Sequence, residues 1–364
     1  MGNKIEKFLI NNIVPILMTI IILSMVPISG LSVDYIIKEI ILRLSRNLFL
    51  VLSLIIPVIA GMGLNFGIVL GAMAGQFALI MISEWGIIGL QGIGLAAIIS
   101  VPAAIIMGIL SGMVLNRAKG REMITSMILG YFINGVYQLI FLYGMGSIIP
   151  MKNQNILLTR GYGVRNAIDL KNIRKALDNA WELKIEDYSI PLMTIFVIIL
   201  LCLFILWFRK SKLGQDMRAI GQDMEVSSSA GIDVNKTRLV SVIISTILAA
   251  FGQIVFLQNM GTLNTYNSHE QIGMFSIAAL LVGGATVSKA SISNALSGVV
   301  LFHAMFILAP AAGKTLMGSP EIGEYFRVFV SYGIIALVLI LHQWRREKEK
   351  SRERKLNFQS KIGK

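Results

Sequence analysis

The chain has 364 residues, of which 55% are hydrophobic and 15% are charged, and its mean hydropathy is +0.72. Soluble domains carry about 25% charged residues, so this composition excludes an ordinary soluble protein and a disordered chain. The single cysteine, Cys202, excludes a disulfide scaffold. A net charge of +13 would suggest a nucleic-acid partner in a soluble protein. Here the charges lie almost wholly between long apolar stretches, and we predict an integral membrane protein with no nucleic-acid partner.

Apolar stretches that approach the length of a membrane span recur along the whole chain. A helix needs about 20 mostly apolar residues to cross the hydrocarbon layer of a bilayer. Only the last stretch contains a charged side chain, Arg327 at its edge. We therefore predict an all-α membrane protein with about ten transmembrane helices. The ten stretches are 13–30, 48–64, 66–82, 90–114, 123–149, 190–208, 239–257, 274–287, 292–311 and 326–341.

The Lys and Arg residues between these stretches predict the orientation in the membrane. Short cytoplasmic loops carry an excess of Lys and Arg. With both termini cytoplasmic, 21 of the 33 basic residues fall on the inner side and 12 on the outer side, so we predict cytoplasmic N and C termini. The first stretch resembles a signal peptide, but no small-x-small cleavage site follows Pro27–Gly30. We interpret it as a retained helix.

This orientation gives one transmembrane domain, residues 1–344, and a basic cytoplasmic tail, residues 345–364, which we expect near anionic membrane lipid. An external loop at 150–189 is long enough for about two short helices, for example Leu170–Leu183. A second predicted outer loop, 258–273, contains no Lys or Arg. The longest cytoplasmic loop is expected at 209–238.

Small residues recur at helical spacing in several stretches. Glycines stand at every fourth position from residue 63 to residue 75, and Gly108 and Gly112 form another such pair. Small residues at this spacing let helix backbones approach closely in lipid. We interpret these glycines as helix-packing positions.

Carboxamide side chains within the apolar stretches have two possible roles. An amide in hydrocarbon needs a hydrogen-bond partner, which is supplied either by a neighbouring helix or by a solute in a pathway. Asn134 and Gln138 are four residues apart and share a helical face, and Tyr131 lies one turn before them. The candidate pathway residues are Asn65, Gln76, Tyr131, Asn134, Gln138 and Gln253.

The sequence contains no residue set that indicates an enzyme. The three histidines fall in an outer loop, a span and the cytoplasmic edge, so we expect no metal site, and no carboxylate lies within the predicted spans. Ala311–Thr315 ends like a P-loop, but the first glycine of that motif is Leu308 here. An uncharged pathway suits a neutral solute and suggests that another protein supplies the energy. Sodium held by backbone carbonyls stays an alternative.

The cytoplasmic loop 209–238 has the pattern of two short amphipathic helices. We expect them to join at Gly221 and to end at Gly231 in a left-handed turn. Asp223 is a plausible N-cap for the second helix, with Met224, Ser228 and Ile232 on one side. Such a loop is either a docking surface for a soluble partner or a solvated connection.

The run LGQDMRAIGQDMEVSSSAGIDVNKTR, residues 213–238, resembles the coupling loop of permease subunits of bacterial ATP-binding-cassette importers. It is most similar to the branch that serves simple sugars, nucleosides and branched-chain amino acids. There the loop reads roughly LGRAMRAVGQNPEAARLAGINV and inserts a short helix into a groove on the ATPase. The resemblance covers residues 60–310 of this chain.

Other stretches match that family in the same order. Leu64–Gly67, followed by Gly75 and Gln76, resembles its nucleoside-type F-N-I-G-x-E-G-Q region. Glu122–Tyr131 resembles its E-V-I-T-T-I-M-L-N-Y helix. Ile277–Gly284 and the pair Val299-Val300 resemble its glycine-rich eighth and ninth spans.

The chain also departs from the family pattern. Met224 replaces the proline of the coupling loop, Val226 and Ser227 replace its alanines, and Gly130 replaces the asparagine of the helix motif. The glutamate of the first motif is missing. We expect these changes to leave coupling to the ATPase intact, because docking depends on shape. The choice of solute is more easily altered by them.

The resemblance implies the permease subunit of an importer in a bacterial plasma membrane, not itself an enzyme. Two permease subunits would form the pathway, two cytoplasmic ATPases would bind at 211–232, and an extracytoplasmic solute-binding protein would dock outside. The chain would need no cofactor, because the partner subunit binds ATP. A simple sugar or nucleoside is favoured over a branched-chain amino acid, and a self-sufficient carrier or channel is the alternative. The implied coupling residues are Leu213, Gly214, Met217, Arg218, Gly221, Met224, Ala230, Gly231 and Ile232.

Overall fold

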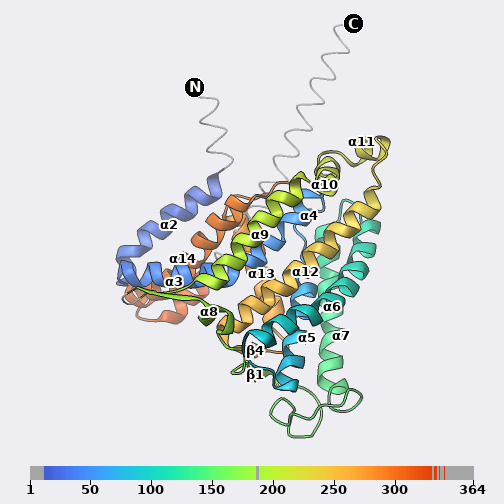
Figure 1. Cartoon of the computed structure of the whole chain (residues 1–364). Coiled ribbons are helices and arrows are strands. Elements are labelled where there is room, and N and C mark those ends of the chain that lie inside the picture. Colours follow the sequence, from blue (N-terminus) through green and yellow to red (C-terminus); the bar gives the residue numbers. More distant parts are fainter. Residues whose placement is uncertain (1–11, 186–187, 330–331, 334–335, 337–339, 341–364) are drawn as a thin grey trace, which may run out of the picture.

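The computed structural model describes residues 12–185, 188–329, 332, 333, 336 and 340 (Figure 1). The predicted tail 345–364 lies outside these residues. The described part is mostly helical. Its helices include α2 (Ile13–Ser29), α3 (Val33–Ser53), α4 (Ile55–Ile59), α5 (Ile68–Trp85), α6 (Gly89–Arg117), α7 (Glu122–Leu139) with its π-helical extension η1 (Ile140–Gly144), α8 (Ala176–Ala180), α9 (Leu192–Lys210), α10 (Lys212–Gln222), α11 (Met224–Ser229), α12 (Val234–Met260), α13 (Ser268–Val282) and α14 (Ile292–Met317).

Seven helical segments within the described residues are long and apolar enough to cross a membrane. Helices α2, with 17 residues, and α13, with 15 residues, are shorter. The prediction of an all-α membrane protein is confirmed at this level. The seven segments are Val33–Ile59, Ile68–Trp85, Gly89–Arg117, Glu122–Gly144, Leu192–Lys210, Val234–Met260 and Ile292–Met317.

The stretch predicted at 48–64 starts too late, because α3 begins at Val33, within the connection that the prediction leaves between residues 30 and 48. The Ser32 side chain caps this helix by accepting a hydrogen bond from the backbone N–H of Tyr35 at 3.3 Å. Glu39 and Arg43 form an i,i+4 ion pair at 3.2 Å within the helix. The charges that suggested a loop are therefore tolerated inside a helix.

Helix α12 lies against both α5 and α6, and glycines make these contacts close (Figure 1). A Cβ atom on Gly71 or Gly75 of α5 would lie 2.4 Å from a backbone carbonyl oxygen of α12. On α6, a Cβ atom on Gly108 would lie 2.9 Å from the α-carbon of Ile243, and one on Gly112 would lie 2.5 Å from the side chain of Leu239, both in α12. These four positions confirm the packing interpretation. The glycines at 63 and 67 precede the first residue of α5 and lie outside the helical stripe.

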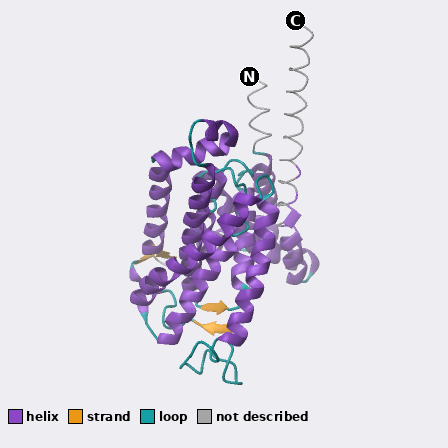
Figure 2. Cartoon of the chain, turned by 90° about the vertical axis from the view of Figure 1, so that its right-hand side faces the viewer, coloured by secondary structure: helices purple, strands orange, loops and turns teal. Residues whose placement is uncertain are grey.

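The two ends of the bundle carry different structures (Figures 1 and 2). Helices α10 and α11 lie at one end. At the other end lie the segment 145–166 and the antiparallel pair of β1 (Ala167–Asp169) with β4 (Thr262–Asn264). Strands β2 (Glu182–Ile185) and β3 (Tyr188–Pro191) form a second antiparallel pair before α9. The predicted external and cytoplasmic loops are therefore at opposite ends of the molecule.

The predicted external helix Leu170–Leu183 is wrong in extent, since only the five residues of α8 are helical there. Asp178 of α8 is buried and fastens the segment to the bundle. Its carboxylate accepts hydrogen bonds from Thr194 of α9 at 2.5 Å and from Gln258 and Asn259 of α12 at 3.1 and 2.7 Å. Side-chain anchoring therefore replaces regular structure in this segment.

The P-loop-like residues Ala311–Thr315 lie inside α14, which continues to Met317. Their backbone N–H groups are therefore used within a helix and do not form a phosphate-binding loop. Like the missing first glycine at Leu308, this placement argues against a P-loop.

Candidate functional site

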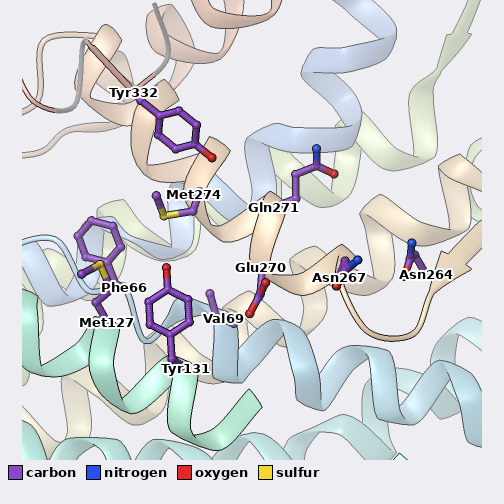
Figure 3. A pocket seen from close by; sticks show the side chains of 11 residues that line it. Phe66, Val69, Met127, Tyr131, Asn264, Asn267, Glu270, Gln271, Met274 and Tyr332 are labelled. Atoms are coloured by element: carbon purple, nitrogen blue, oxygen red, sulfur yellow. The ribbon is translucent and has the colours of Figure 1, made fainter. Parts of the chain in front are cut away.

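A cavity of about 520 Å³ lies among α5, α7 and α13 (Figure 3). This volume is within the range of about 300–1,000 Å³ that is usual for small-molecule sites. Aromatic, aliphatic and methionine side chains share the wall with amides, phenols and one carboxylate. The lining residues are Phe66, Val69, Met127, Gly130, Tyr131, Asn264, Asn267, Glu270, Gln271, Met274 and Tyr332.

A tight turn before α5 places Phe66 at the cavity. The Asn65 side-chain oxygen accepts a hydrogen bond from the backbone N–H of Gly67 at 2.9 Å, which closes the turn. The Phe66 N–H donates to the Ser126 hydroxyl of α7 at 3.1 Å. Asn65 is therefore occupied in shaping the wall, and the ring of Phe66 faces the cavity.

A chain of buried polar groups connects α5, α13 and α7 behind the cavity. Gln76 and His269 are 3.2 Å apart, from Oε1 to Nδ1, and His269 Nε2 is 2.7 Å from Asn134 Oδ1. The amide nitrogen of Asn134 then donates to the carboxylate of Glu270. Both ring nitrogens of His269 face amide oxygens, so only the doubly protonated ring donates to both.

The segment between β4 and α13 is held from two directions. Gln76 Nε2 donates to the backbone carbonyl oxygens of Asn264 at 2.9 Å and Thr265 at 2.8 Å. The Tyr266 hydroxyl donates to the carbonyl oxygen of Val164 at 2.7 Å. Partial burial raises the pKa of the Tyr266 phenol above its ordinary value, so it stays a donor near neutral pH. The start of α13 is thereby fixed against both α5 and the segment 145–166.

The predicted outer loop 258–273 is wrong over its second half, because α13 begins at Ser268. The expectation of a bundle without carboxylates fails for the same reason. The first turn of α13 carries His269, which is buried, and Glu270, which lines the cavity. A sequence signal was present: Ser268 precedes an acidic residue and an apolar run, as at many helix starts.

At the opposite end, α10 and α11 form the two short helices predicted for 209–238. The Asp223 side chain caps α11 by accepting hydrogen bonds from the backbone N–H groups of Glu225 at 2.9 Å and Val226 at 3.0 Å. Gly231 has φ of +85°, the left-handed conformation expected after the second helix. The predicted junction at Gly221 is wrong, since α10 continues to Gln222 and the break is at Asp223.

Gly221 makes a close contact within the chain itself. A Cβ atom there would lie 2.3 Å from the carbonyl oxygen of Ile59 and 3.2 Å from the backbone nitrogen of Gly61. Met217 and Ile220 of α10 are also buried. The apolar face of α10 therefore packs on the bundle, next to the end of α4.

A buried ion pair anchors the following segment. Arg238 of α12 is fully buried, and its guanidinium donates to the carboxylate of Glu122, at the start of α7, at 2.5 Å. A second guanidinium nitrogen lies 3.0 Å from the sulfur of Met224 in α11. Three elements therefore meet at one charged side chain.

The outward side of α11 remains open to solvent. Val226 is 65% exposed, and Ala230, one turn further on, is also exposed. Met224 and Ile232 are only partly exposed. The apolar residues available to a partner are thus Val226 and Ala230, whereas the predicted face of Met224 and Ile232 turns partly toward the protein.

Comparison with known families matches residues 36–340 to the family described as branched-chain amino acid transport system, permease component. The chain belongs to this permease family. The match extends beyond the residues 60–310 that carry the resemblance in the sequence, and it includes the cavity and both short helices. No solved structure matches.

Three curated relatives are permease proteins of transport systems, and two of them are named as ABC transporter permeases. The nucleoside ABC transporter permease protein NupB of Lactococcus lactis is 25% identical over 53% of this chain and 50% of the relative. The probable ABC transporter permease protein YphD of Escherichia coli is 28% identical over 42% and 44%. The xylose transport system permease protein XylH of Haemophilus influenzae is 25% identical over 43% and 40%. The chain spans about half the length, or less, of these relatives.

The structure brings together part of the pathway set predicted from the sequence. Tyr131 lines the cavity, and Asn134 and Gln76 belong to the polar chain behind it. Gln138 is half-buried outside the lining. Gln253 of α12 is fully buried, and neither end of its amide has a hydrogen-bond partner within the described part of the chain. A pathway role for each of these residues stays a prediction.

The coupling residues predicted for this permease occupy two different environments. Gly214, Met217 and Gly221 are turned toward the bundle. Arg218, Ala230 and Gly231 are exposed. Leu213, Met224 and Ile232 are partly exposed. The first group therefore positions the loop, and the second is available for contact.

Proposed function

We propose that the chain is the membrane-spanning permease subunit of an ATP-driven importer for a small, uncharged polar solute. The family match over residues 36–340 carries this proposal. A simple sugar or a nucleoside is the favoured solute, because the relatives named above include nucleoside and xylose permeases. The chain provides the pathway, and partner subunits bind and hydrolyse ATP.

The topology proposed with this function has ten membrane crossings and cytoplasmic N and C termini. The distribution of Lys and Arg supports it, with 21 on the inner side and 12 on the outer side. The position of α10 and α11 opposite β1 and β4 supports it as well (Figure 2). The three crossings beyond the seven long segments are α2, α13 and the stretch 326–341 predicted from the sequence, half of which lies outside the described residues.

In this proposal α11 and the exposed side of α10 bind the cytoplasmic ATPase. Val226 and Ala230 offer a small apolar contact, and α10 is fixed to the end of α4 through Gly221. Movement of the bound ATPase is thereby passed to the bundle by a rigid connection. A second permease subunit, a solute-binding protein on the outer end and membrane lipid complete the expected partners.

The cavity of Figure 3 is the proposed part of the solute pathway in this chain. Its lining combines hydrogen-bonding groups with aromatic and aliphatic surface. Such a mixture suits a molecule with hydroxyl groups and some apolar surface. The side chains of Asn65 and Gln76 form hydrogen bonds with backbone groups of the chain and hold the shape of the cavity wall.

A self-sufficient secondary carrier is the second candidate. Ionisable groups in the bundle are typical of proton-coupled transport, and His269 with Glu270 supplies such groups. Membership of a family whose named relatives are ABC transporter permeases favours the importer.

Reconstitution separates the two functions. The purified chain is placed in proteoliposomes alone, with P-loop ATPase subunits from the same genome, and with those subunits plus the solute-binding protein. Uptake of radiolabelled uridine and xylose is then measured with and without ATP. We expect uptake only with the ATPase and ATP. Uptake by the chain alone, driven by a pH gradient, would assign it to secondary carriers.

A further inference from the structure

The described part of the cavity wall has one charged group, and its placement restricts the chemistry of the solute. Among the described residues that line the cavity, Glu270 is the only one with a charged side chain, and none is a Lys or Arg. Figure 3 shows Glu270 extending from α13 on the side of the cavity that Val69 and Tyr131 line. A carboxylate accepts hydrogen bonds from up to four directions.

The orientation of this carboxylate is fixed by the groups behind it. Asn134 donates to one oxygen of Glu270, and His269 holds the other end of the Asn134 amide at 2.7 Å. Gln76 holds His269 and is itself bonded to two backbone carbonyl oxygens. Such supporting contacts keep a binding group in place before the ligand arrives. The lone pairs that Asn134 does not use are available to a solute in the cavity.

Aromatic surface lies beside the carboxylate. Phe66 and Tyr131 line the wall together with Met127 and Met274, and Tyr131 is 61% exposed. A planar, partly apolar ring can stack on such side chains. A nucleobase presents such a ring on both of its faces, whereas a simple sugar presents only the C–H side of a puckered ring.

We propose that the cavity binds nucleosides, with the ribose hydroxyl groups donating to Glu270 and the base resting on Tyr131 and Phe66. This inference rests on the proposed function and adds the class of solute and its contacts. A vicinal diol presents two hydroxyl donors to one carboxylate, and charge-assisted hydrogen bonds of this kind are the strong ones. The base supplies the flat surface that the aromatic residues can contact.

The same arrangement argues against two other classes of solute. A nucleotide would bring its phosphate into a cavity whose lining, as far as the structure describes it, offers a carboxylate and no cation. A zwitterionic amino acid could pair its ammonium group with Glu270, but its own carboxylate would have no charged partner there. Burying an unpaired charge is costly. Nucleosides carry no such charge.

Ligand-observed saturation-transfer NMR on the full chain in lipid nanodiscs tests the contacts without the solute-binding protein. The probes are uridine, 2′,3′-dideoxyuridine, xylose, leucine and uridine monophosphate. The variants are Glu270→Gln, Tyr131→Leu and the matched control Glu321→Gln, which changes an exposed glutamate outside the cavity. The elution profile of each variant checks its folding.

We expect uridine to bind best among the five probes. Glu270→Gln should weaken uridine binding by about tenfold, the size expected for a hydrogen bond to a charged group, and should leave dideoxyuridine binding unchanged. Tyr131→Leu should weaken both nucleosides equally. Glu321→Gln should change neither.

Several results would overturn the nucleoside proposal. Glu270→Gln could weaken uridine and dideoxyuridine to the same extent, or neither, and the carboxylate would then have no role at the ribose. Preferential binding of xylose, leucine or the nucleotide would reject the solute class. If the chain binds none of the five probes yet supports ATP-dependent uptake after reconstitution, this inference fails while the proposed function stands.

Discussion

Gly221 is the residue at which α10 and the helical bundle come into backbone contact. The space between its α-carbon and the carbonyl oxygen of Ile59 has no room for a side chain, because a Cβ atom would lie 2.3 Å from that oxygen. Substitution by valine would therefore disturb the permease itself and could not report on ATPase docking alone. The glycine is needed for the fold of this chain.

We predict that Gly221→Ala lowers the stability of the purified chain by about 1–3 kcal/mol, the usual cost of overpacking a tight contact. Gly135 of α7 is the matched control, since no atom lies within 4 Å of a Cβ atom built there. Gly135→Ala should leave the melting temperature unchanged or slightly raised, because alanine is the better helix former. Thermal unfolding in detergent, followed by size-exclusion elution, measures both. Equal melting temperatures for the two variants would show that the contact is easily relieved.

The buried pair of Arg238 and Glu122 gives a second prediction. Glu122→Ala leaves a fully buried guanidinium without its carboxylate, and breaking such a pair costs about 3–5 kcal/mol. Glu39→Ala breaks the partly exposed pair with Arg43 and should cost no more than about 1 kcal/mol.

The double variant Glu122→Leu with Arg238→Met completes this experiment. It removes both charges, so it should recover most of the stability lost in Glu122→Ala. The free energy of unfolding from denaturant titration checks all three. A double variant that is less stable than Glu122→Ala would contradict the electrostatic explanation and assign the cost to packing.

At the scale of elements, the exposed residues of α11 are distinct from the residues that hold the loop on the bundle. Val226 and Ala230 are one turn apart and both exposed. We predict that Val226→Asp and Ala230→Glu weaken ATPase binding by about tenfold or more, because a charge buried in an apolar contact is unfavourable. Both variants should keep the melting temperature of the parent. Co-purification and biolayer interferometry with the ATPase subunit measure the effect.

Lys289→Glu is the control for these two variants. It changes an exposed charge in the connection between α13 and α14, and ATPase binding should change little. If all three variants bind like the parent, α11 is a solvated segment and the ATPase contacts another surface.

Caps and turns of short elements can be predicted from the sequence more reliably than the first and last residues of long helices. The cap at Asp223 and the left-handed turn at Gly231 depend on local chemistry, and both are present. The start of α3 was missed because Lys38, Arg43 and Arg46 suggested a loop. A helix begins where its N–H groups are capped, here at Ser32, and ends of membrane helices carry charge without unwinding.

The residues of the cavity can be predicted from the sequence only in part, because some of them are brought together by contacts between distant helices. Tyr131, Asn134 and Gln76 stand out as polar groups in apolar stretches, which is a local signal. Glu270 does not, because its partner Asn134 is 136 positions away and neither residue indicates the other. Contacts between distant elements are set by how the helices pack, and this is why the carboxylate was assigned to an outer loop.

At the scale of the molecule, every proposed partner depends on which end of the chain faces the cytoplasm. We predict that a cysteine at Gln222 is labelled from the cytoplasm and a cysteine at Gln154 from outside, in a Cys202→Ser background. Gln154 lies in the exposed segment after η1, at the end opposite α10. Gln271 is less suitable as an external reporter because it lines the cavity.

Membrane-impermeant maleimide on intact cells and on inverted vesicles measures the labelling. The Cys202→Ser parent without added cysteines is the control. Labelling of both positions from the same side would overturn the proposed topology.

The hydrogen bonds from Gln76 to the carbonyl oxygens of Asn264 and Thr265 have a mechanical consequence. They attach the short backbone link between β4 and the helix that carries Glu270 to α5. A push on β1 and β4 would therefore meet α5 before it reached the carboxylate, and it would displace Glu270 only if these two hydrogen bonds broke or if α5 moved as well. Small movements of the strand pair are in this way kept from disturbing the cavity.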